Sequence, residues 1–226
     1  MAYELITFDL DGTLVDTAAE ISEAANLAIE AHGIPRRPVE QITLLIGAGT
    51  RDLMRRLLEQ CFAEQPGLAQ SVRPDAVMAS FDQYYADTTG TSARPYDGCH
   101  EALARLRSAG VRLACVTNKE FRHARAVLDA VRLNCYFDLV IGGDSLPEKK
   151  PHASVLRHVA DTLGVGLDRT AHVGDSSADV LAARNAGVTA WAVPYGYNAG
   201  KPIADAKPDR IFDNLLQVAG QALAGH

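Results

Sequence analysis

Five short apolar segments alternate along this sequence with segments of helical periodicity; four are followed by polar or glycine residues and the fifth by Pro194. The apolar segments are LITF at 5–8, VRLACV at 111–116, LVIGG at 139–143, AHV at 171–173 and AWAV at 190–193. Because they are apolar throughout and partly β-branched, they suit strands buried on both faces. Strands that alternate with helices predict an α/β fold with a doubly wound, mostly parallel, Rossmann-like sheet.

The helical segments between the later strands end in glycine. CHEALARLRSAG, HASVLRHVADTLG and ADVLAARNAG end at Gly110, Gly164 and Gly187, where a glycine is a plausible C-cap. Residues 16–94 break the alternation, because they show helical periodicity and no convincing strand. About eighty residues far exceed an ordinary strand-to-helix loop. We therefore expect a helical cap domain at 16–94, inserted into an α/β core domain made of 1–15 and 95–226.

Composition narrows the class of protein. The formal net charge is −6 and no basic stripe is visible, so we expect no nucleic-acid partner. No apolar segment is long enough to cross a bilayer, and no secretory signal is visible, so we expect a cytoplasmic protein without a membrane partner. The four cysteines form no CxxC pair and are expected to be reduced thiols. The sequence leaves the oligomeric state open.

Polar side chains gather where the predicted strands end. Ligands of open parallel sheets bind beyond the carboxyl ends of the strands, so residues at these ends share one edge. We expect that edge to hold Asp9, Asp11, Thr117, Asn118, Lys149, Lys150, Asp175 and Asp179.

Carboxylates crowded at this edge repel one another, which a divalent cation would relieve. Oxygen ligands without histidine or cysteine favour Mg²⁺ over zinc. A metal, carboxylates and a lysine together indicate a phosphate site, in which Thr117 and Asn118 could donate hydrogen bonds to phosphate oxygens. A carboxylate nucleophile needs no deprotonation at neutral pH.

Four motifs carry a family resemblance. DLDGT at 9–13, VTN at 116–118, KKP at 149–151 and GDSSAD at 174–179 resemble, in order, the motifs of the haloacid dehalogenase-like hydrolase superfamily. IGAGTRDLM at 46–54, IGGD at 141–144, KKPH at 149–152 and PYGYN at 194–198 resemble bacterial phosphoglycolate phosphatases. The resemblance covers essentially the whole chain and implies a helical cap after the first motif.

The resemblance also implies roles for individual residues. Asp9 is the nucleophile that becomes an aspartyl phosphate, and Asp11 is the general acid and then the general base. Mg²⁺ is held by Asp9, the backbone carbonyl of Asp11 and Asp175, with Asp179 supporting the metal shell. Thr117 binds the phosphoryl group. Lys150 stabilises its charge and is preferred to Lys149 because it directly precedes proline.

The expected activity is therefore that of a Mg²⁺-dependent phosphomonoesterase acting on a small anionic phosphate ester, with 2-phosphoglycolate as the best guess. A phosphosugar mutase, or a phosphatase for another sugar or amino-sugar phosphate, is the alternative. Carbon–halogen hydrolysis is disfavoured because a leaving halide needs no proton from Asp11. A non-catalytic module has no support, since every motif residue is present.

Simpler interpretations exist for several of these residues. Asp-Gly is a common turn signal, and Asp179 could merely favour a helix N-terminus. In the cap, Thr50 and Arg51 follow two glycines, whose free N–H groups could bind an anion while Arg51 binds a substrate carboxylate. Equally, the glycines could form a turn with Arg51 exposed. Lys149 is expected to be a solvated charge.

Overall fold

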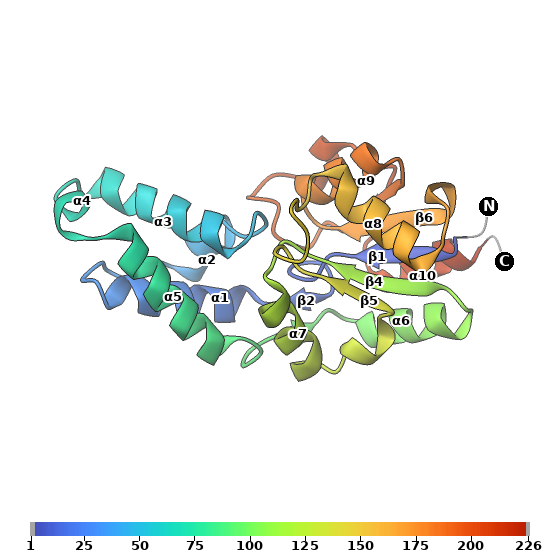
Figure 1. Cartoon of the computed structure of the whole chain (residues 1–226), viewed down its shortest axis with the longest axis horizontal. Helices are drawn as coiled ribbons and strands as arrows, with labels where there is room; N and C mark the ends of the chain where they lie inside the picture. The colour runs from blue at the N-terminus through green and yellow to red at the C-terminus, as the bar shows by residue number, and fades with distance from the viewer. Residues whose placement is uncertain (1–2, 225–226) are drawn as a thin grey trace.

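A six-stranded parallel sheet forms the centre of the larger part of the molecule (Figure 1). The structure is a computed structural model that describes residues 3–224. The strand order is β5-β4-β1-β6-β7-β8, and all neighbouring strands pair in parallel. The strands are β1 (Leu5–Phe8), β4 (Arg112–Val116), β5 (Leu139–Ile141), β6 (Thr170–Gly174), β7 (Thr189–Ala192) and β8 (Arg210–Ile211).

Helices cover both faces of this sheet. In the central strand β1, Ile6 and Phe8 pack into one hydrophobic cluster and Leu5 into another, because successive side chains of a strand point to opposite faces. The first cluster includes α6 (Cys99–Ser108), α7 (Phe121–Ala130) and α10 (Leu215–Leu223), and the second includes α8 (Ala153–Leu163) and α9 (Ser177–Ala186). The predicted doubly wound α/β fold is confirmed, with each of the five predicted strands in place.

Two of the three predicted glycine C-caps are in place, whereas α6 has Ala109 as its C-cap with Gly110 directly after it. α8 and α9 are capped by Gly164 and Gly187 in the left-handed conformation, with φ of 63° and 82°. Three short 3₁₀ segments complete the connections: η1 (Asn134–Tyr136), η2 (Leu167–Arg169) and η3 (Ile203–Ala206). We call residues 3–14 and 96–224 the sheet core.

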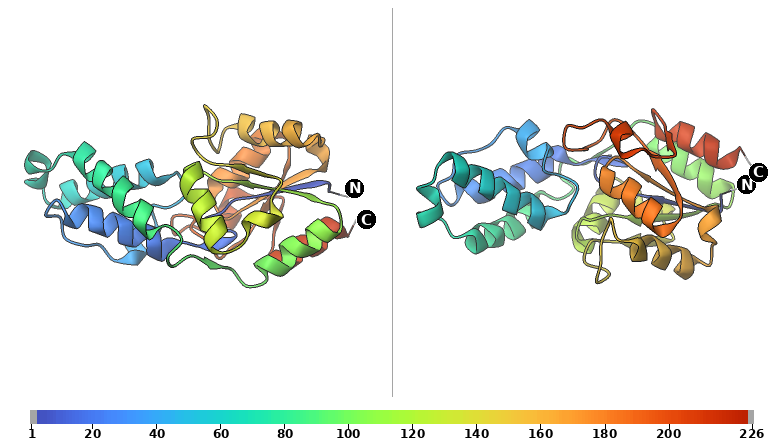
Figure 2. Two further views of the ribbon diagram at one scale, coloured as in Figure 1. Left: turned by 60° about the horizontal axis from the view of Figure 1, so that its bottom comes forward. Right: turned by 90° about the horizontal axis from the view of Figure 1, so that it is seen from above.

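Residues 18–88 form a separate helical lobe at one end of the sheet core (Figures 1 and 2). The lobe has a hydrophobic cluster of its own, centred on α1 and α5. Pro74 is the first residue of α5, where its missing N–H costs nothing. The helices are α1 (Ala18–Glu30), α2 (Val39–Thr43), α3 (Thr50–Glu64), α4 (Leu68–Ser71) and α5 (Pro74–Thr88).

The chain enters and leaves the lobe through a two-stranded antiparallel ribbon of β2 (Val15–Asp16) and β3 (Arg94–Pro95). This ribbon lies close to the predicted boundaries at residues 16 and 94. Movement of the lobe as a cap domain stays a prediction.

No helix among residues 3–224 combines the length and apolarity needed to span a membrane. The four cysteines are free thiols; Cys61, Cys99 and Cys115 are buried, and Cys135 is exposed.

Candidate active site

The loops after three central strands meet at the carboxyl edge of the sheet, beside the helical lobe. Asp9 follows β1, Thr117 follows β4, and Asp175 follows β6. Lys150 reaches the same edge from the loop between β5 and α8. Parallel pairing of β1 with both β4 and β6 brings these strand ends together, as the sequence predicted.

Three buried carboxylates form a cluster at this edge. Oxygen atoms of Asp9, Asp175 and Asp179 lie within 4.8 Å of one another. The ammonium group of Lys150 lies 2.7 Å from Asp9 Oδ1 and 2.6 Å from Asp179 Oδ1. One buried cation therefore faces three carboxyl groups, and the local charge is unbalanced when all three are ionised.

Asp179 is fully engaged by protein groups. Its Oδ1 atom contacts Lys150 and lies 3.1 Å from His172 Nε2. Its Oδ2 atom accepts hydrogen bonds from the backbone N–H and the hydroxyl of Ser176. Burial opposes its ionisation, but Lys150 and His172 hold the pKa of Asp179 well below its usual value. Asp179 therefore orients Lys150, and its four acceptor positions are occupied without a metal.

Asp9 and Asp175 are less well compensated. Burial raises the pKa of Asp9 to about 6, even though Lys150 opposes the shift. Burial and the charge of Asp9 raise the pKa of Asp175 well above its usual value. Asp175 accepts hydrogen bonds from the Thr13 hydroxyl at 2.9 Å and the Tyr197 N–H at 2.5 Å. Each of its oxygens retains acceptor capacity, so this oxygen-only pair fits a hard divalent cation such as Mg²⁺.

Glycine permits the close approach of backbone to Asp175. Gly12 has a φ of 86°, and a Cβ atom there would lie 2.5 Å from Asp175 Oδ2. A side chain at this position would both strain the backbone and displace the carboxylate. The glycine of the DLDGT motif is thus required by the packing of the first motif against the fourth.

Asp11 lies apart from the acid cluster and faces the lobe. Its Oδ1 atom accepts a hydrogen bond from the Thr17 hydroxyl at 2.6 Å and contacts Lys119 Nζ at 2.8 Å. Any contribution of Asp11 to a metal site therefore comes from its backbone, whereas its carboxylate borders a cavity between core and lobe.

This cavity has a volume of about 30 Å³. The sheet core and the lobe both contribute to its wall, and the lobe side chains are largely apolar. The lining residues are Asp9, Asp11, Thr117, Asn118 and Lys119 from the core, and Ile21, Ile46, Gly47, Gly49, Thr50, Leu53 and Tyr85 from the lobe. A cavity of this size favours a small ligand over a large one.

The other predicted site residues divide into two groups. Thr117 lines the cavity, and its hydroxyl accepts a hydrogen bond from the Lys119 N–H. Asn118 lines it too, but its amide donates to the carbonyls of Gly47 and Lys150, each at 3.1 Å. The side chain of Asn118 thus holds the lobe loop against the core rather than an incoming phosphate.

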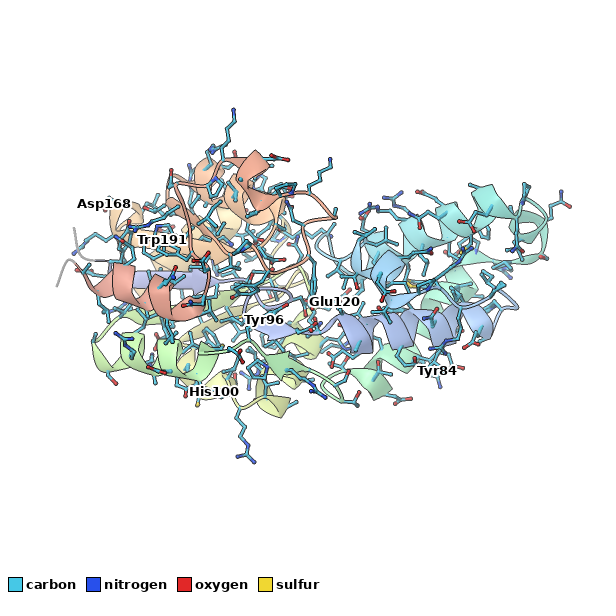
Figure 3. All side chains as sticks on the ribbon, turned by 180° about the vertical axis from the view of Figure 1, so that it is seen from behind. Tyr84, Tyr96, His100, Glu120, Asp168 and Trp191 are labelled. Carbon is cyan, nitrogen blue, oxygen red and sulfur yellow. The ribbon has the colours of Figure 1, made fainter. Side chains whose placement is uncertain are left out.

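The predicted lobe residues point in different directions. Thr50 lines the cavity and donates a 2.5 Å hydrogen bond to Glu120, which lies on the side of the sheet core that faces the lobe (Figure 3). Arg51 is exposed and lines two outer depressions instead of the cavity. Lys149 is exposed as predicted, yet its ammonium group donates to the Ala48 carbonyl at 2.7 Å. Both basic residues lie at the outer rim of the junction.

Sequence reasoning did not identify Lys119, Thr13, His172 or Tyr197, all of which contact the predicted acids. Lys119 directly follows the VTN motif, so its place in the chain was a usable signal. The sequence could not show that Lys119 is buried, because residues of the lobe complete the cavity that encloses it.

Comparisons with known proteins agree with this site. A family model described as haloacid dehalogenase-like hydrolase matches residues 3–187. A phosphoglycolate phosphatase from Nitrosococcus oceani is 35% identical over 215 residues, covering 95% of this chain and 94% of the relative. Phosphoglycolate phosphatase 1 from Pseudomonas aeruginosa is 39% identical over 221 residues, covering 96% of this chain and 80% of the relative.

Solved structures resemble the whole chain as well. A crystal structure from Haemophilus somnus 129PT, described as that of a predicted phosphoglycolate phosphatase, superimposes with a TM-score of 0.91 at 31% identity. The match covers 97% of both chains. The sheet core and the lobe therefore occur together in a relative of similar length.

Proposed function

Because this chain belongs to the haloacid dehalogenase-like hydrolase family and is a phosphatase, we propose that it hydrolyses 2-phosphoglycolate through an aspartyl-phosphate intermediate with Mg²⁺ as cofactor. The observation that carries the proposal is the environment of Asp9. Its carboxylate is buried, contacts Lys150, and borders the cavity between core and lobe. A nucleophile in this position meets a ligand enclosed by both parts of the chain.

The residues divide the chemistry among themselves. Asp9 attacks the phosphorus atom, and the bond to the leaving alkoxide breaks. Lys150 offsets the negative charge that gathers between Asp9 and the phosphoryl oxygens. The Thr117 hydroxyl donates a hydrogen bond to one of these oxygens. Asp11, on the lobe side of Asp9, donates a proton to the leaving alkoxide and then accepts one from the water that hydrolyses the intermediate.

Asp9, Asp175 and the backbone carbonyl of Asp11 are the proposed metal ligands. When bound, Mg²⁺ supplies positive charge that offsets the carboxylates and the phosphate. Asp179 keeps Lys150 directed at Asp9, and Thr13 orients Asp175. These supporting contacts fix the first and fourth motifs in one arrangement.

The choice of substrate rests on the relatives and on size. The curated relatives described above are named phosphoglycolate phosphatases. A cavity of about 30 Å³ favours an organic group of a few atoms over a sugar or amino sugar. The lobe would also exclude bulk water while the phosphoryl group is transferred.

The test combines product release with detection of the intermediate. Purified protein is expected to release phosphate from 2-phosphoglycolate with Mg²⁺ and to stop when the metal is chelated. Asp9→Asn is expected to abolish turnover, and acid-quenched wild-type protein should carry phosphate on the peptide that contains Asp9. Asp168→Asn, an exposed matched change, is the control. Turnover by the Asp9→Asn protein at the wild-type rate would exclude the proposed nucleophile.

A further inference from the structure

Lys119 is a buried cation beside the reaction site, and the proposed mechanism gives it no role. Its side chain is almost fully buried. The ammonium group contacts Asp11 at 2.8 Å and lies 5.2 Å from the centre of the Tyr85 ring. A buried ammonium group is unfavourable unless negative groups surround it, so its place at the cavity wall requires a physical reason.

Lys119 is also the one cation among the described residues that line the cavity. Among the lobe residues in the wall, Ile21, Ile46 and Leu53 are apolar, and Thr50 and Tyr85 contribute neutral hydroxyl groups. The exposed Arg51 and Lys149 line an outer depression of about 140 Å³ instead. An anionic group enclosed in the cavity therefore meets the charge of Lys119 and no other lining cation.

We propose that Lys119 binds the carboxylate of the substrate, and that it thereby selects phosphate esters whose short organic group carries a carboxylate. This inference rests on the proposed function and assigns the group that determines its specificity. An ammonium group has three N–H donors, and Asp11 accepts one of them. Donors remain for a second carboxylate that enters the cavity.

The position of Lys119 suits this role. It lies two residues after Thr117, so one loop following β4 holds a group for the phosphoryl end and a group for the other end of the ligand. The cavity admits only a short spacer between them. In 2-phosphoglycolate a single methylene group separates the ester oxygen from the carboxylate carbon.

Two competing roles for the basic residues lead to different measurable outcomes. In the first, Lys119 serves only to neutralise Asp11, which it contacts at 2.8 Å, and Glu20, whose ionised form its charge favours. Its removal would then lower activity on every phosphate ester alike. In the second, Arg51 binds the carboxylate from the outer rim.

The experiment compares 2-phosphoglycolate with its amide, which has the same shape and no negative charge on the organic group. The measured quantity is the ratio of kcat/KM for the acid to kcat/KM for the amide. Any effect of a substitution on Asp11 changes both values and cancels in the ratio. Wild-type protein is expected to prefer the acid by about 10- to 100-fold, the effect of one hydrogen-bonded charge pair.

Three variants identify the residue responsible. Lys119→Gln is expected to bring the ratio close to one, and Lys119→Arg is expected to retain a preference for the acid. Arg51→Gln is expected to keep the wild-type ratio. Lys201→Gln, which removes an exposed charge away from the cavity, is the matched control.

Each result decides between these roles. An unchanged ratio in Lys119→Gln, or a loss of preference in Arg51→Gln alone, overturns the inference. Wild-type protein that is active with a ratio near one overturns it too. Wild-type protein inert towards both esters overturns the proposed function instead.

If Lys119→Gln does not fold, inhibition of the wild-type protein by glycolate and glycolamide gives an independent measurement. Glycolate is expected to inhibit at a concentration at least about tenfold lower. Equal inhibition by the two compounds overturns the inference.

Discussion

The Nζ atom of Lys150 lies 2.7 Å from the Oδ1 atom of Asp9, and both side chains are buried. Replacing this lysine by glutamine leaves Asp9 and Asp179 facing each other without the intervening cation. We expect Lys150→Gln to lower kcat/KM for 2-phosphoglycolate at least about 100-fold, the effect of losing one preorganised charge at a developing anion. Steady-state phosphate release with saturating Mg²⁺ measures this.

The neighbouring lysine provides the control. Lys149 is exposed and contacts only a carbonyl of the lobe loop among the hydrogen bonds of residues 3–224, so Lys149→Gln is expected to lower activity less than about fivefold. A larger loss in Lys149→Gln than in Lys150→Gln would reverse the assignment.

Asp9 is expected to destabilise the metal-free protein. Its folded-state pKa of about 6 lies above the ordinary value of 3.8. The free energy of unfolding is therefore highest below pH 3.8, where Asp9 is protonated in both states. It falls as the pH rises through 6, because the buried carboxyl group must then ionise in the folded protein. At pH 7.5, Asp9→Asn should raise the free energy of unfolding by about 1–3 kcal/mol in urea titrations with a chelator present.

Added Mg²⁺ should stabilise the wild-type protein more than Asp9→Asn, because the variant lacks one anionic ligand. Asp168→Asn controls for the loss of an exposed carboxylate. Equal metal-induced stabilisation of Asp9→Asn and wild type would contradict the proposed metal site.

Tyr197 connects the acid cluster to the start of the lobe. Its hydroxyl accepts hydrogen bonds from the N–H groups of Thr17 at 2.9 Å and Ala18 at 3.1 Å and donates to Asp16. α1 has no side-chain cap from Thr17, so Tyr197 supplies that function, together with Asp16, which also accepts a hydrogen bond from the Ala18 N–H. Tyr197→Phe is expected to lower the free energy of unfolding by about 1–2 kcal/mol.

Urea unfolding at constant pH measures the effect of Tyr197→Phe. Tyr84→Phe, a change within the lobe and away from the junction, is the matched control (Figure 3). An equal loss in both variants would mean that the capping contacts contribute nothing specific.

His123 should make stability fall in mild acid. Burial, together with the charges of Arg122 and Lys119, lowers the pKa of this histidine to about 4. Its Nδ1 atom lies 3.0 Å from the Thr89 hydroxyl, at the contact between the core and the end of α5. Between pH 6.5 and 4 the unfolded chain binds a proton that the folded chain does not, so this contribution to stability is lost as the pH falls.

His123→Gln should therefore show a smaller decrease in the free energy of unfolding from pH 7.5 to 5 than wild type. His158→Gln, which removes an exposed histidine, should behave like wild type. Parallel pH profiles for His123→Gln and wild type would contradict the assignment.

Three of the strands that sequence analysis located share one physical property. β1, β4 and β6 are buried along their whole length, apart from the exposed Arg112 at the start of β4, so each is a mostly apolar segment that can be recognised locally. β2, β3 and β8 have two residues each, too few for any period to be read. The sequence analysis did not locate α7 or α10. α10 contains Gly220, which weakens its helical pattern, whereas α7 could have been recognised from the spacing of its apolar residues.

The same contrast holds at the site. Asp9, Thr117 and Asp175 were predictable because strand ends of a parallel sheet share an edge. The enclosure of Lys119 and the outward direction of Arg51 were not, since both depend on where the helical lobe lies against the core. Sequence spacing within one motif contains no information about a surface made by another part of the chain.

The sheet order has a consequence for synthesis on the ribosome. β1 leaves the exit tunnel first, yet Leu5 pairs with Arg112 and Thr170. The helices of residues 18–88 pack mostly on one another and can collapse as soon as they emerge. Until β4 has been translated, LITF stays an unpaired apolar segment beside the helical bundle, and its second edge stays open until β6 follows, which makes it a target for holding chaperones in the nascent chain.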